Sequence, residues 1–378
     1  MPRFTEQEER YMSKALALAR KGLGQTSPNP MVGCLIVKND QIIGRGYHRK
    51  AGGPHAEVVA LRSLKTNPAG ATIYITLEPC IHQGQTPPCL GPIIEAGISE
   101  AIIAMPDPNP IVNKKGIRGL RHGGIRVRTG LLEREAQQLN EAFVTYHTLK
   151  RPFIIAKWAI TLDGRTATDS GSSKWISNPA SRHYVHVLRS QVDAVMVGIG
   201  TVIKDNPRLD VRLPNYKGRQ PRRIIIDGHL KTPTRCNCLS LDKGGLAIVI
   251  AAEKAAPEKR VKAIRDFGHS VIFIKGAGGI VRLEEAFQKL HEVGIQSILV
   301  EGGRRIHTSL LERGLVDRVV GFVTPKVIGG GAIRNPIEGW GVQDMGQCLE
   351  LDDVKIQKFD DDVCIEGYIR RATRKRSR

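Results

Sequence analysis

Three side chains that bind transition metals well occur close together in this chain: His55, Cys80 and Cys89. One imidazole and two thiolates suit a tetrahedral Zn²⁺, and three protein ligands leave the fourth position to water. Glu57 stands two residues after His55. A carboxylate in that place can move protons to and from water at a catalytic metal. The pattern therefore predicts a catalytic zinc site.

The arrangement His-x-Glu followed by Pro-Cys is typical of zinc deaminases that act on nucleobases, although Cys80 and Cys89 are further apart than in C-x-x-C. A structural zinc site is the alternative, but closed sites need four protein ligands. Cys34 is a candidate fourth ligand, yet its apolar flanks predict a buried strand residue. We expect the remaining cysteines to be a surface loop pair (Cys236 and Cys238) and two packing residues (Cys348 and Cys364).

Strand and helix ends are expected to position these ligands. Glycines and a proline precede His55, which predicts a helix starting there, and an apolar strand over 72–77 leads to Cys80. A second helix is predicted to start at Cys89. A strand over 101–104 then runs into the proline-rich loop 106–110. Alternating strands and helices imply an α/β layer sandwich.

A second domain is predicted after the linker at 150–152, where a new apolar strand begins. Its glycine-rich turn at Gly302 and Gly303 follows a strand and precedes a helix, which is a favourable place for a phosphate. Gly198-Ile199-Gly200 also ends a strand but lacks the third glycine of the dinucleotide fingerprint. A Rossmann domain is therefore not supported. We assign 1–149 and 150–370 to two domains and 371–378 to a basic, disordered tail.

The net charge of +20 requires an anionic partner or substrate to be considered, and six of the positive charges lie in the last nine residues. Readers of single-stranded nucleic acid stack bases on aromatic side chains, and aromatic residues make up only 5% of this chain. The composition thus favours a phosphorylated small molecule over nucleic acid. The N-terminus has no signal-peptide pattern and no apolar run is long enough to span a membrane, so we expect a cytoplasmic protein with reduced thiols.

Motifs spread over the chain resemble the bifunctional deaminase/reductase family of riboflavin biosynthesis, from about residue 5 to about residue 370. The deaminase motifs are Thr26-Ser27-Pro28-Asn29-Pro30, His55-Ala56-Glu57, Leu77-Glu78-Pro79-Cys80, Thr86-Pro87-Pro88-Cys89 and Asp107-Pro108-Asn109-Pro110. The reductase motifs are Leu162-Asp163-Gly164-Arg165, Ser173-Lys174-Trp175-Ile176, the stretch 201–207 and Val300-Glu301-Gly302-Gly303.

The resemblance implies an N-terminal cytidine-deaminase-like α/β/α sandwich and a C-terminal dihydrofolate-reductase-like α/β domain. It also implies two reactions, hydrolytic deamination of 2,5-diamino-6-ribosylamino-4(3H)-pyrimidinone 5′-phosphate and NADPH-dependent reduction of the ribosyl group to ribityl. His55, Cys80 and Cys89 would bind zinc, and Glu57 would transfer protons from water to the leaving amine. The positions that would contact the pyrimidine and its phosphoribosyl arm are Asn29, His48, His82, Asp107 and Asn109.

In the reductase half, the resemblance places one group of residues against NADPH and another against the substrate. The NADPH group is Ala159, Trp175, Thr201, Asp205, Gly303, Arg304, Arg305, Ile306, His307, Thr308 and Ser309. The substrate group is Ser173, Arg189, Leu209, Arg212 and Glu301, with the two arginines suited to phosphate. Lys157 and Asp205 are candidates for polarising or protonating the sugar. We further expect Arg304 and Arg305 to favour NADPH over NADH.

Two departures from the family stand in one loop, where Ile81 replaces the usual serine and Gln85 the usual arginine. Neither is a metal ligand. The competing hypotheses are a working deaminase joined to a damaged reductase, a nucleic-acid deaminase or binding protein, and a purely structural zinc protein in which Glu57 would have no role. We expect a homo-oligomer.

Overall fold

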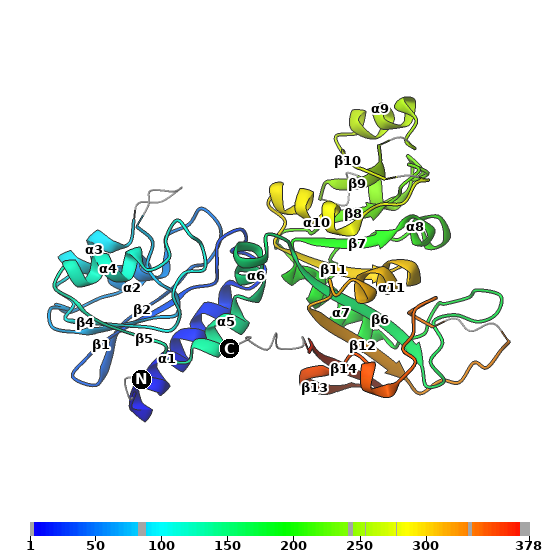
Figure 1. The fold of residues 1–378 in the computed structure, drawn as a ribbon. Coiled ribbons are helices and arrows are strands. Elements are labelled where there is room, and N and C mark those ends of the chain that lie inside the picture. Colours follow the sequence, from blue (N-terminus) through cyan, green and yellow to red (C-terminus); the bar gives the residue numbers. More distant parts are fainter. Residues whose placement is uncertain are drawn as a thin grey trace. The chain divides into compact units, whose positions relative to one another are not determined.

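The computed structural model describes residues 4–81, 88–240, 245–253, 255–276, 278–331 and 335–370. The chain divides into two compact units, Met1–Arg151 and Pro152–Arg378 (Figure 1). Each unit is built on its own sheet and is described separately. No helix in the described ranges is both long and apolar enough to cross a membrane.

The first unit is built on a five-stranded sheet of order β2-β1-β3-β4-β5. Strand β1 is antiparallel to both β2 and β3, whereas β3, β4 and β5 run parallel. The turn between β1 and β2 is Asn39-Asp40, and both residues have positive φ (49° and 59°) as a tight hairpin requires. The strands are β1 (Gly33–Lys38), β2 (Gln41–Tyr47), β3 (Thr72–Ile75), β4 (Glu100–Ile103) and β5 (Arg126–Thr129).

Helices cover both faces of this sheet, because alternate strand residues point to opposite sides. Side chains from α2, α3 and α4 pack with one set of strand residues, and side chains from α1, α5 and α6 pack with the other. The result is a three-layer α/β/α sandwich. The helices are α1 (Glu6–Ala19), η1 (Arg20–Gly22), α2 (Ala56–Arg62), α3 (Leu90–Glu95), α4 (Lys115–His122), α5 (Glu133–Leu139) and α6 (Glu141–Leu149).

Two local features fix where α1 begins and how closely α2 packs on the sheet. Thr5 starts α1 with a capping box, in which its side chain accepts from the N–H of Glu8 and the Glu8 carboxylate accepts from the N–H of Thr5. Gly46 of β2 lies so close to α2 that a Cβ there would stand 2.1 Å from the carbonyl oxygen of Ala56. Only glycine allows the helix to pack at this depth on the strand.

The second unit has a nine-stranded sheet of order β10-β9-β8-β7-β11-β6-β12-β14-β13. Neighbouring strands from β10 to β12 are parallel, and β14 and β13 complete one edge as antiparallel strands. The strands are β6 (Phe153–Thr161), β7 (Ala194–Gly198), β8 (Arg222–Ile226), β9 (Ala247–Ala252), β10 (Ser270–Ile274), β11 (Ser297–Gly302), β12 (Arg318–Thr324), β13 (Leu351–Phe359) and β14 (Asp362–Ile369).

The helices between these strands follow the alternation expected for parallel strands. Residues of α10 and α11 pack on one face of the sheet, against Ile154 and Ala156 of β6 among others. Sequence periodicity did not predict α8 or the β13–β14 hairpin. The helices are α7 (Pro179–Gln191), α8 (Ile199–Asp205), η2 (Asn237–Leu239), α9 (Glu258–Asp266), α10 (Leu283–Glu292), α11 (Arg304–Glu312) and η4 (Met345–Gln347).

Two expectations for the cysteines are wrong. Cys236 and Cys238 are buried rather than in a surface loop, because the turn at η2 packs inward and the Cys238 thiol donates to the carbonyl of Pro207 (3.0 Å). Cys348 is exposed rather than a packing residue. The expectations for Cys34 and Cys364 are confirmed, since both are buried in strands.

Candidate active sites

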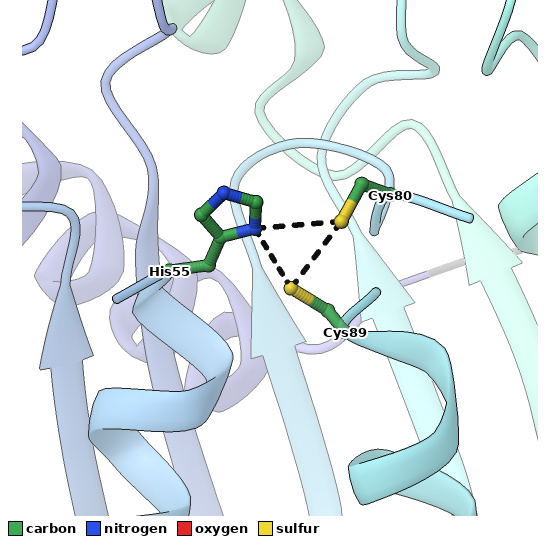
Figure 2. A group of neighbouring side chains, drawn as sticks. All are labelled: His55, Cys80 and Cys89. Carbon is green, nitrogen blue, oxygen red and sulfur yellow. Dashed lines mark hydrogen bonds between the residues drawn. The ribbon is translucent and has the colours of Figure 1, made fainter. Parts of the chain in front are cut away.

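The three predicted zinc ligands converge at one end of the first sheet. His55 caps the start of α2, Cys80 follows β3, and Cys89 caps the start of α3 (Figure 2). The Nδ1 atom of His55 lies 3.0 Å from Sγ of Cys89 and 3.4 Å from Sγ of Cys80, and the two sulfurs are 3.5 Å apart. A tetrahedral zinc with bonds of about 2.0–2.3 Å separates its ligand atoms by about 3.3–3.8 Å, so these atoms fit the ion with little adjustment.

Glu57 lies in the first turn of α2, beside His55. Its side chain is buried, and the Oε2 atom has no hydrogen-bond partner among the described residues. Burial raises the pKa of this carboxyl, opposed by the nearby His55. A buried carboxylate oxygen without a partner is costly, which indicates that it serves a ligand or water that the fold itself does not provide.

A second histidine supports the same site. His48 is buried, and its Nδ1 donates to the carbonyl oxygen of Pro54 (3.1 Å), which leaves Nε2 to accept from the amide of Asn29 (3.1 Å). Burial lowers the pKa of His48, so the ring is held neutral. Its ring stands edge-on to that of His55, with centroids 5.5 Å apart. Two of the predicted substrate residues, Asn29 and His48, are thus bonded to each other next to the metal ligands.

The loop after β4 carries two more predicted substrate residues. Asp107 is buried, its carboxylate accepts from the N–H of Asn109 (2.8 Å), and Asn109 in turn accepts from the N–H of Ile111 (3.1 Å). Burial raises the pKa of Asp107 to about 7, with the charge of Glu78 acting in the same direction. This carboxyl can therefore donate or accept a proton near neutral pH. The remaining predicted residue, His82, lies outside the described residues, as does Gln85.

A cavity of about 1020 Å³ opens in the second unit at the carboxyl ends of the parallel strands. Open parallel sheets bind ligands at this edge. The turns after β7 and β11 and the start of α11 border the cavity, and a helix start attracts phosphate. Fifteen of the predicted reductase residues line it: Lys157, Ala159, Ser173, Trp175, Arg189, Thr201, Asp205, Arg212, Glu301, Gly303, Arg304, Arg305, Ile306, His307 and Ser309.

Two predicted residues do not line this cavity as described. Leu209 is buried beside the ion-paired Asp210, and Thr308 is turned into α11, where its hydroxyl donates to the carbonyl of Arg304 (2.9 Å). Sequence reasoning also missed part of the lining, in particular Gly228, His229 and Lys231 after β8. The position of these residues just beyond an apolar strand was the signal that could have identified them.

Lys157 and Glu301 lie on adjacent strands, since Ala156 of β6 pairs with Val300 of β11. The ammonium of Lys157 makes no hydrogen bond or ion pair with any residue that the structure describes, although it stands 5.7 Å from the ring centroid of Phe322. Burial lowers the pKa of Lys157, partly offset by the charge of Glu301. A cavity lysine with a lowered pKa and no hydrogen-bond partner among the described residues is typical of a group that acts on substrate.

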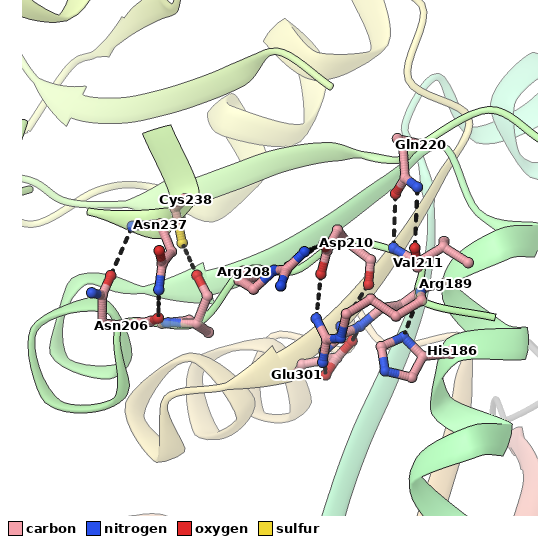
Figure 3. A network of polar contacts seen from close by, with 12 residues as sticks. His186, Arg189, Asn206, Arg208, Asp210, Val211, Gln220, Asn237, Cys238 and Glu301 are labelled. Atoms are coloured by element: carbon pink, nitrogen blue, oxygen red, sulfur yellow. Dashed lines mark hydrogen bonds and ion pairs between the residues drawn. The ribbon is translucent and has the colours of Figure 1, made fainter. Parts of the chain in front are cut away.

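Arg189 is bound to the carboxylate of Glu301 rather than left free for phosphate (Figure 3). Arg189 binds both oxygens of Glu301, with Nη2 2.8 Å from Oε2, and its Nη1 donates to the carbonyl of Asp210 (2.9 Å). Arg212 pairs with the Asp210 carboxylate. Arg212 remains partly exposed, whereas Arg189 is buried. Direct contact between Arg189 and substrate stays a prediction, and its main visible role is to fix Glu301.

His186, which the sequence reasoning did not select, lines the same part of the cavity. Its Nδ1 accepts from the backbone N–H of Arg212 (3.2 Å). Burial, together with the charges of Arg189 and Arg212, lowers the pKa of His186 to about 4. The imidazole is therefore neutral at physiological pH.

Comparison with known proteins agrees with both sites. Residues 5–105 match the cytidine and deoxycytidylate deaminase zinc-binding region, and residues 152–365 match the RibD C-terminal domain. The riboflavin biosynthesis protein RibD of Actinobacillus pleuropneumoniae is 42% identical over 95% of this chain and 94% of its own length. The chain belongs to the RibD family.

Other RibD proteins extend this relationship. RibD of Aquifex aeolicus is 43% identical over 95% of this chain and 98% of its own length. The structure of Acinetobacter baumannii RibD has a TM-score of 0.88 at 36% identity, covering 97% of this chain and 99% of that one. A Thermotoga maritima structure, described as a diaminohydroxyphosphoribosylaminopyrimidine deaminase/5-amino-6-(5-phosphoribosylamino)uracil reductase, has a TM-score of 0.83 at 36% identity and covers 96% of this chain and 99% of that one.

Membership of the RibD family confirms the expected fold class, a deaminase-like α/β/α sandwich joined to a dihydrofolate-reductase-like α/β domain. It also confirms a bifunctional enzyme of riboflavin biosynthesis that is both a deaminase and a reductase, with zinc and NADPH as cofactors. The residues present fit both cofactors. An imidazole and two thiols suit the zinc ion, and a large cavity beside a helix start suits the phosphates of NADPH.

Proposed function

We propose that this chain deaminates 2,5-diamino-6-ribosylamino-4(3H)-pyrimidinone 5′-phosphate and then reduces the ribosyl group of the product to ribityl, giving 5-amino-6-ribitylamino-uracil 5′-phosphate. The first step depends on the triangle of His55, Cys80 and Cys89 and on the adjacent Glu57, whose Oε2 has no hydrogen-bond partner among the described residues. The cavity around Lys157 carries the second. The two substrates are inferred from the name of the Thermotoga maritima relative, which gives both a deaminase and a reductase activity for one polypeptide.

In the deaminase site, the chain's own residues position the pyrimidine and move protons. Zinc, when bound, supplies a Lewis acid that brings the pKa of water toward neutrality. Glu57 would take a proton from the attacking water and give it to the leaving amine, and the raised pKa of its carboxyl favours this transfer. Asn29, His48, Asp107, Asn109 and the undescribed His82 hold the base and its phosphoribosyl arm.

In the reductase site, Lys157 acts on the sugar while neighbouring groups hold it in place. Its ammonium would polarise or protonate the sugar oxygen, and NADPH, when bound, would supply the hydride for the reduction. Glu301 balances the charge of Lys157, and Arg189 fixes Glu301. Asp205 at the end of α8 is a second candidate proton donor, and the cavity-lining residues between Gly303 and Ser309 would hold the cofactor phosphates.

Product analysis tests this assignment. The purified, zinc-loaded protein is incubated with the diaminopyrimidinone phosphate, with and without NADPH, and products are identified by mass spectrometry. We expect ammonia in both reactions and a ribityl product only with NADPH. A chelator that removes zinc should stop the release of ammonia, whereas reduction of the pre-deaminated substrate should continue. Absence of ammonia from the metal-loaded protein, or no reduction of the deaminated compound, would refute the corresponding half.

Arg305 is the better placed of the two arginines to favour NADPH. Both arginines line the cavity and are exposed, but Arg304 is ion-paired with Glu338 (2.6 Å), whereas Arg305 has no ion pair among the described residues. A charged hydrogen bond contributes about 1.5–3 kcal/mol. We therefore expect Arg305→Ala to reduce the ratio of kcat/KM for NADPH to that for NADH by about tenfold or more.

Arg313, at the other end of α11 and paired with Glu284 (3.0 Å), provides the matched control. Arg313→Ala should leave the cofactor ratio unchanged. Displacement of bound 2′,5′-ADP by NADPH, measured in the absence of substrate, reports cofactor binding separately from turnover. Equal efficiency of the unmodified enzyme with NADH and NADPH would contradict the assignment.

We also propose that the protein is a cytoplasmic homo-oligomer. The exposed Val354 and Ile356 on the edge strand β13 are apolar side chains that self-association would bury. Thiols as metal ligands suit a reducing compartment. Light scattering of the purified protein and fractionation of cells measure these two properties, and a monomer in solution would contradict the first.

A further inference from the structure

Glu78 is a buried carboxylate between β3 and Cys80 that no catalytic role absorbs. Its two oxygens accept three backbone N–H groups from a single stretch of chain. Oε2 accepts from Asp107 (3.0 Å) and Lys114 (2.9 Å), and Oε1 accepts from Ile117 (3.0 Å). The three donors mark the beginning of the loop, its end and the first turn of α4.

The loop held in this way carries two of the residues assigned to the substrate. Between the donors at Asp107 and Lys114, the chain is organised by Asn109, whose carbonyl oxygen accepts from Val112 (3.0 Å) and Asn113 (2.9 Å). Asp107 and Asn109 are also linked by the hydrogen bond described above. The loop is therefore internally ordered, and Glu78 is the side chain that fixes both its ends to the strand.

A second contact packs the start of α4 against the backbone beside the metal ligand Cys80. Gly116 lies against the backbone next to Glu78, so that a Cβ there would stand 2.2 Å from the carbonyl oxygen of Pro79 and 3.1 Å from Cγ of Glu78. The next residue after Pro79 is the zinc ligand Cys80. The substrate loop and the strand end that bears a metal ligand are thus joined through one carboxylate and one close backbone approach.

We propose that Glu78 is a positioning residue for deamination: it holds the loop of Asp107 and Asn109 in register with the zinc ligands and so sets the affinity for the pyrimidine without touching it. This proposal rests on the deaminase function proposed above. Carboxylate chemistry is required because both oxygens must accept. A glutamine presents one oxygen and one amide N–H₂ group, and the latter would face a backbone donor and leave it unsatisfied.

Glu78→Gln in the full-length, zinc-loaded protein tests the proposal. We expect KM for the diaminopyrimidinone phosphate to rise about tenfold or more, with kcat within about threefold and zinc content unchanged. Retained zinc shows that the first unit is folded, and reductase activity of the same chain shows that the second unit is folded. The control is Glu100→Gln, since Glu100 is also buried in this unit but pairs with Arg126 and Arg128. It should leave KM unchanged.

An unchanged KM in Glu78→Gln would overturn the proposal, and so would loss of zinc or of kcat with KM unaltered, which would make Glu78 a support of Cys80 alone. Hydrogen exchange of the unmodified protein gives an answer even where the variant does not fold. The amides of Asp107, Lys114 and Ile117 should be protected, and rapid exchange at all three would overturn the proposal. If the unmodified enzyme released no ammonia, the proposed function would fail while the exchange result still stood.

Discussion

Glu57→Gln is expected to stop ammonia release while zinc remains bound at the level of the unmodified protein. The side chain is buried and its Oε2 has no hydrogen-bond partner among the described residues, so the substitution removes proton transfer without removing a metal ligand or a packing group. General acid–base catalysis contributes about 10²–10⁴-fold, and we expect kcat for deamination to fall by at least that factor. Metal analysis and an ammonia assay measure the two quantities on one sample.

The second domain supplies the control for this variant. Reduction of pre-deaminated substrate by Glu57→Gln should equal that of the unmodified enzyme, because the residues of the reductase cavity all lie in the other unit. Continued ammonia release would show that another group transfers the protons. Loss of zinc together with activity would show instead that Glu57 maintains the ligand geometry.

Lys157→Met should abolish reduction and leave deamination intact. The ammonium stands in the cavity next to Glu301 and makes no hydrogen bond to described residues, so its loss removes the polarising charge at low structural cost. We expect kcat for reduction to fall by about 10²–10⁴-fold. The rate of NADPH oxidation with pre-deaminated substrate measures it, and an equal loss in both half-reactions would indicate misfolding rather than chemistry.

The pH dependence of reduction gives an independent test of Lys157. Burial lowers the pKa of this group, with Arg189 acting in the same direction and Glu301 opposing. The protonated form exists below that lowered pKa and disappears as pH rises through it. Reduction should therefore decline on the alkaline side at a lower pH than the ordinary lysine value of about 10.4. Lys157→Arg keeps the charge and should move this decline upward; an unchanged profile would exclude Lys157 as the titrating group.

The metal site could be predicted from sequence because its geometry is local. His55 and Cys89 each begin a helix and Cys80 follows a strand, and those element ends are visible in glycine, proline and apolar patterns. Neighbouring strands then bring the ends together. The glycine turn at Gly303 could be predicted from the sequence for the same reason, because it joins the end of β11 to the start of α11.

Contacts between distant residues could not be predicted in this way. Arg189 and Glu301 are separated by 112 positions, and spacing alone does not reveal that the guanidinium is committed to a carboxylate. The three backbone donors on Glu78 come from a loop whose path no periodicity specifies. The hairpin of β13 and β14 was missed because β13 is exposed along most of its length, and α8 because Gly200 interrupts its apolar pattern.

The close packing of Gly46 against α2 limits how this enzyme can be re-engineered. The carbonyl of Ala56 that a side chain at 46 would strike belongs to the residue directly after the ligand His55. Adding even one methyl group would have to lift the helix start, and the imidazole with it, away from the two sulfurs. The absence of a side chain at Gly46 therefore keeps His55 at the right distance from the two cysteine sulfurs. Stabilising substitutions should be sought at other positions.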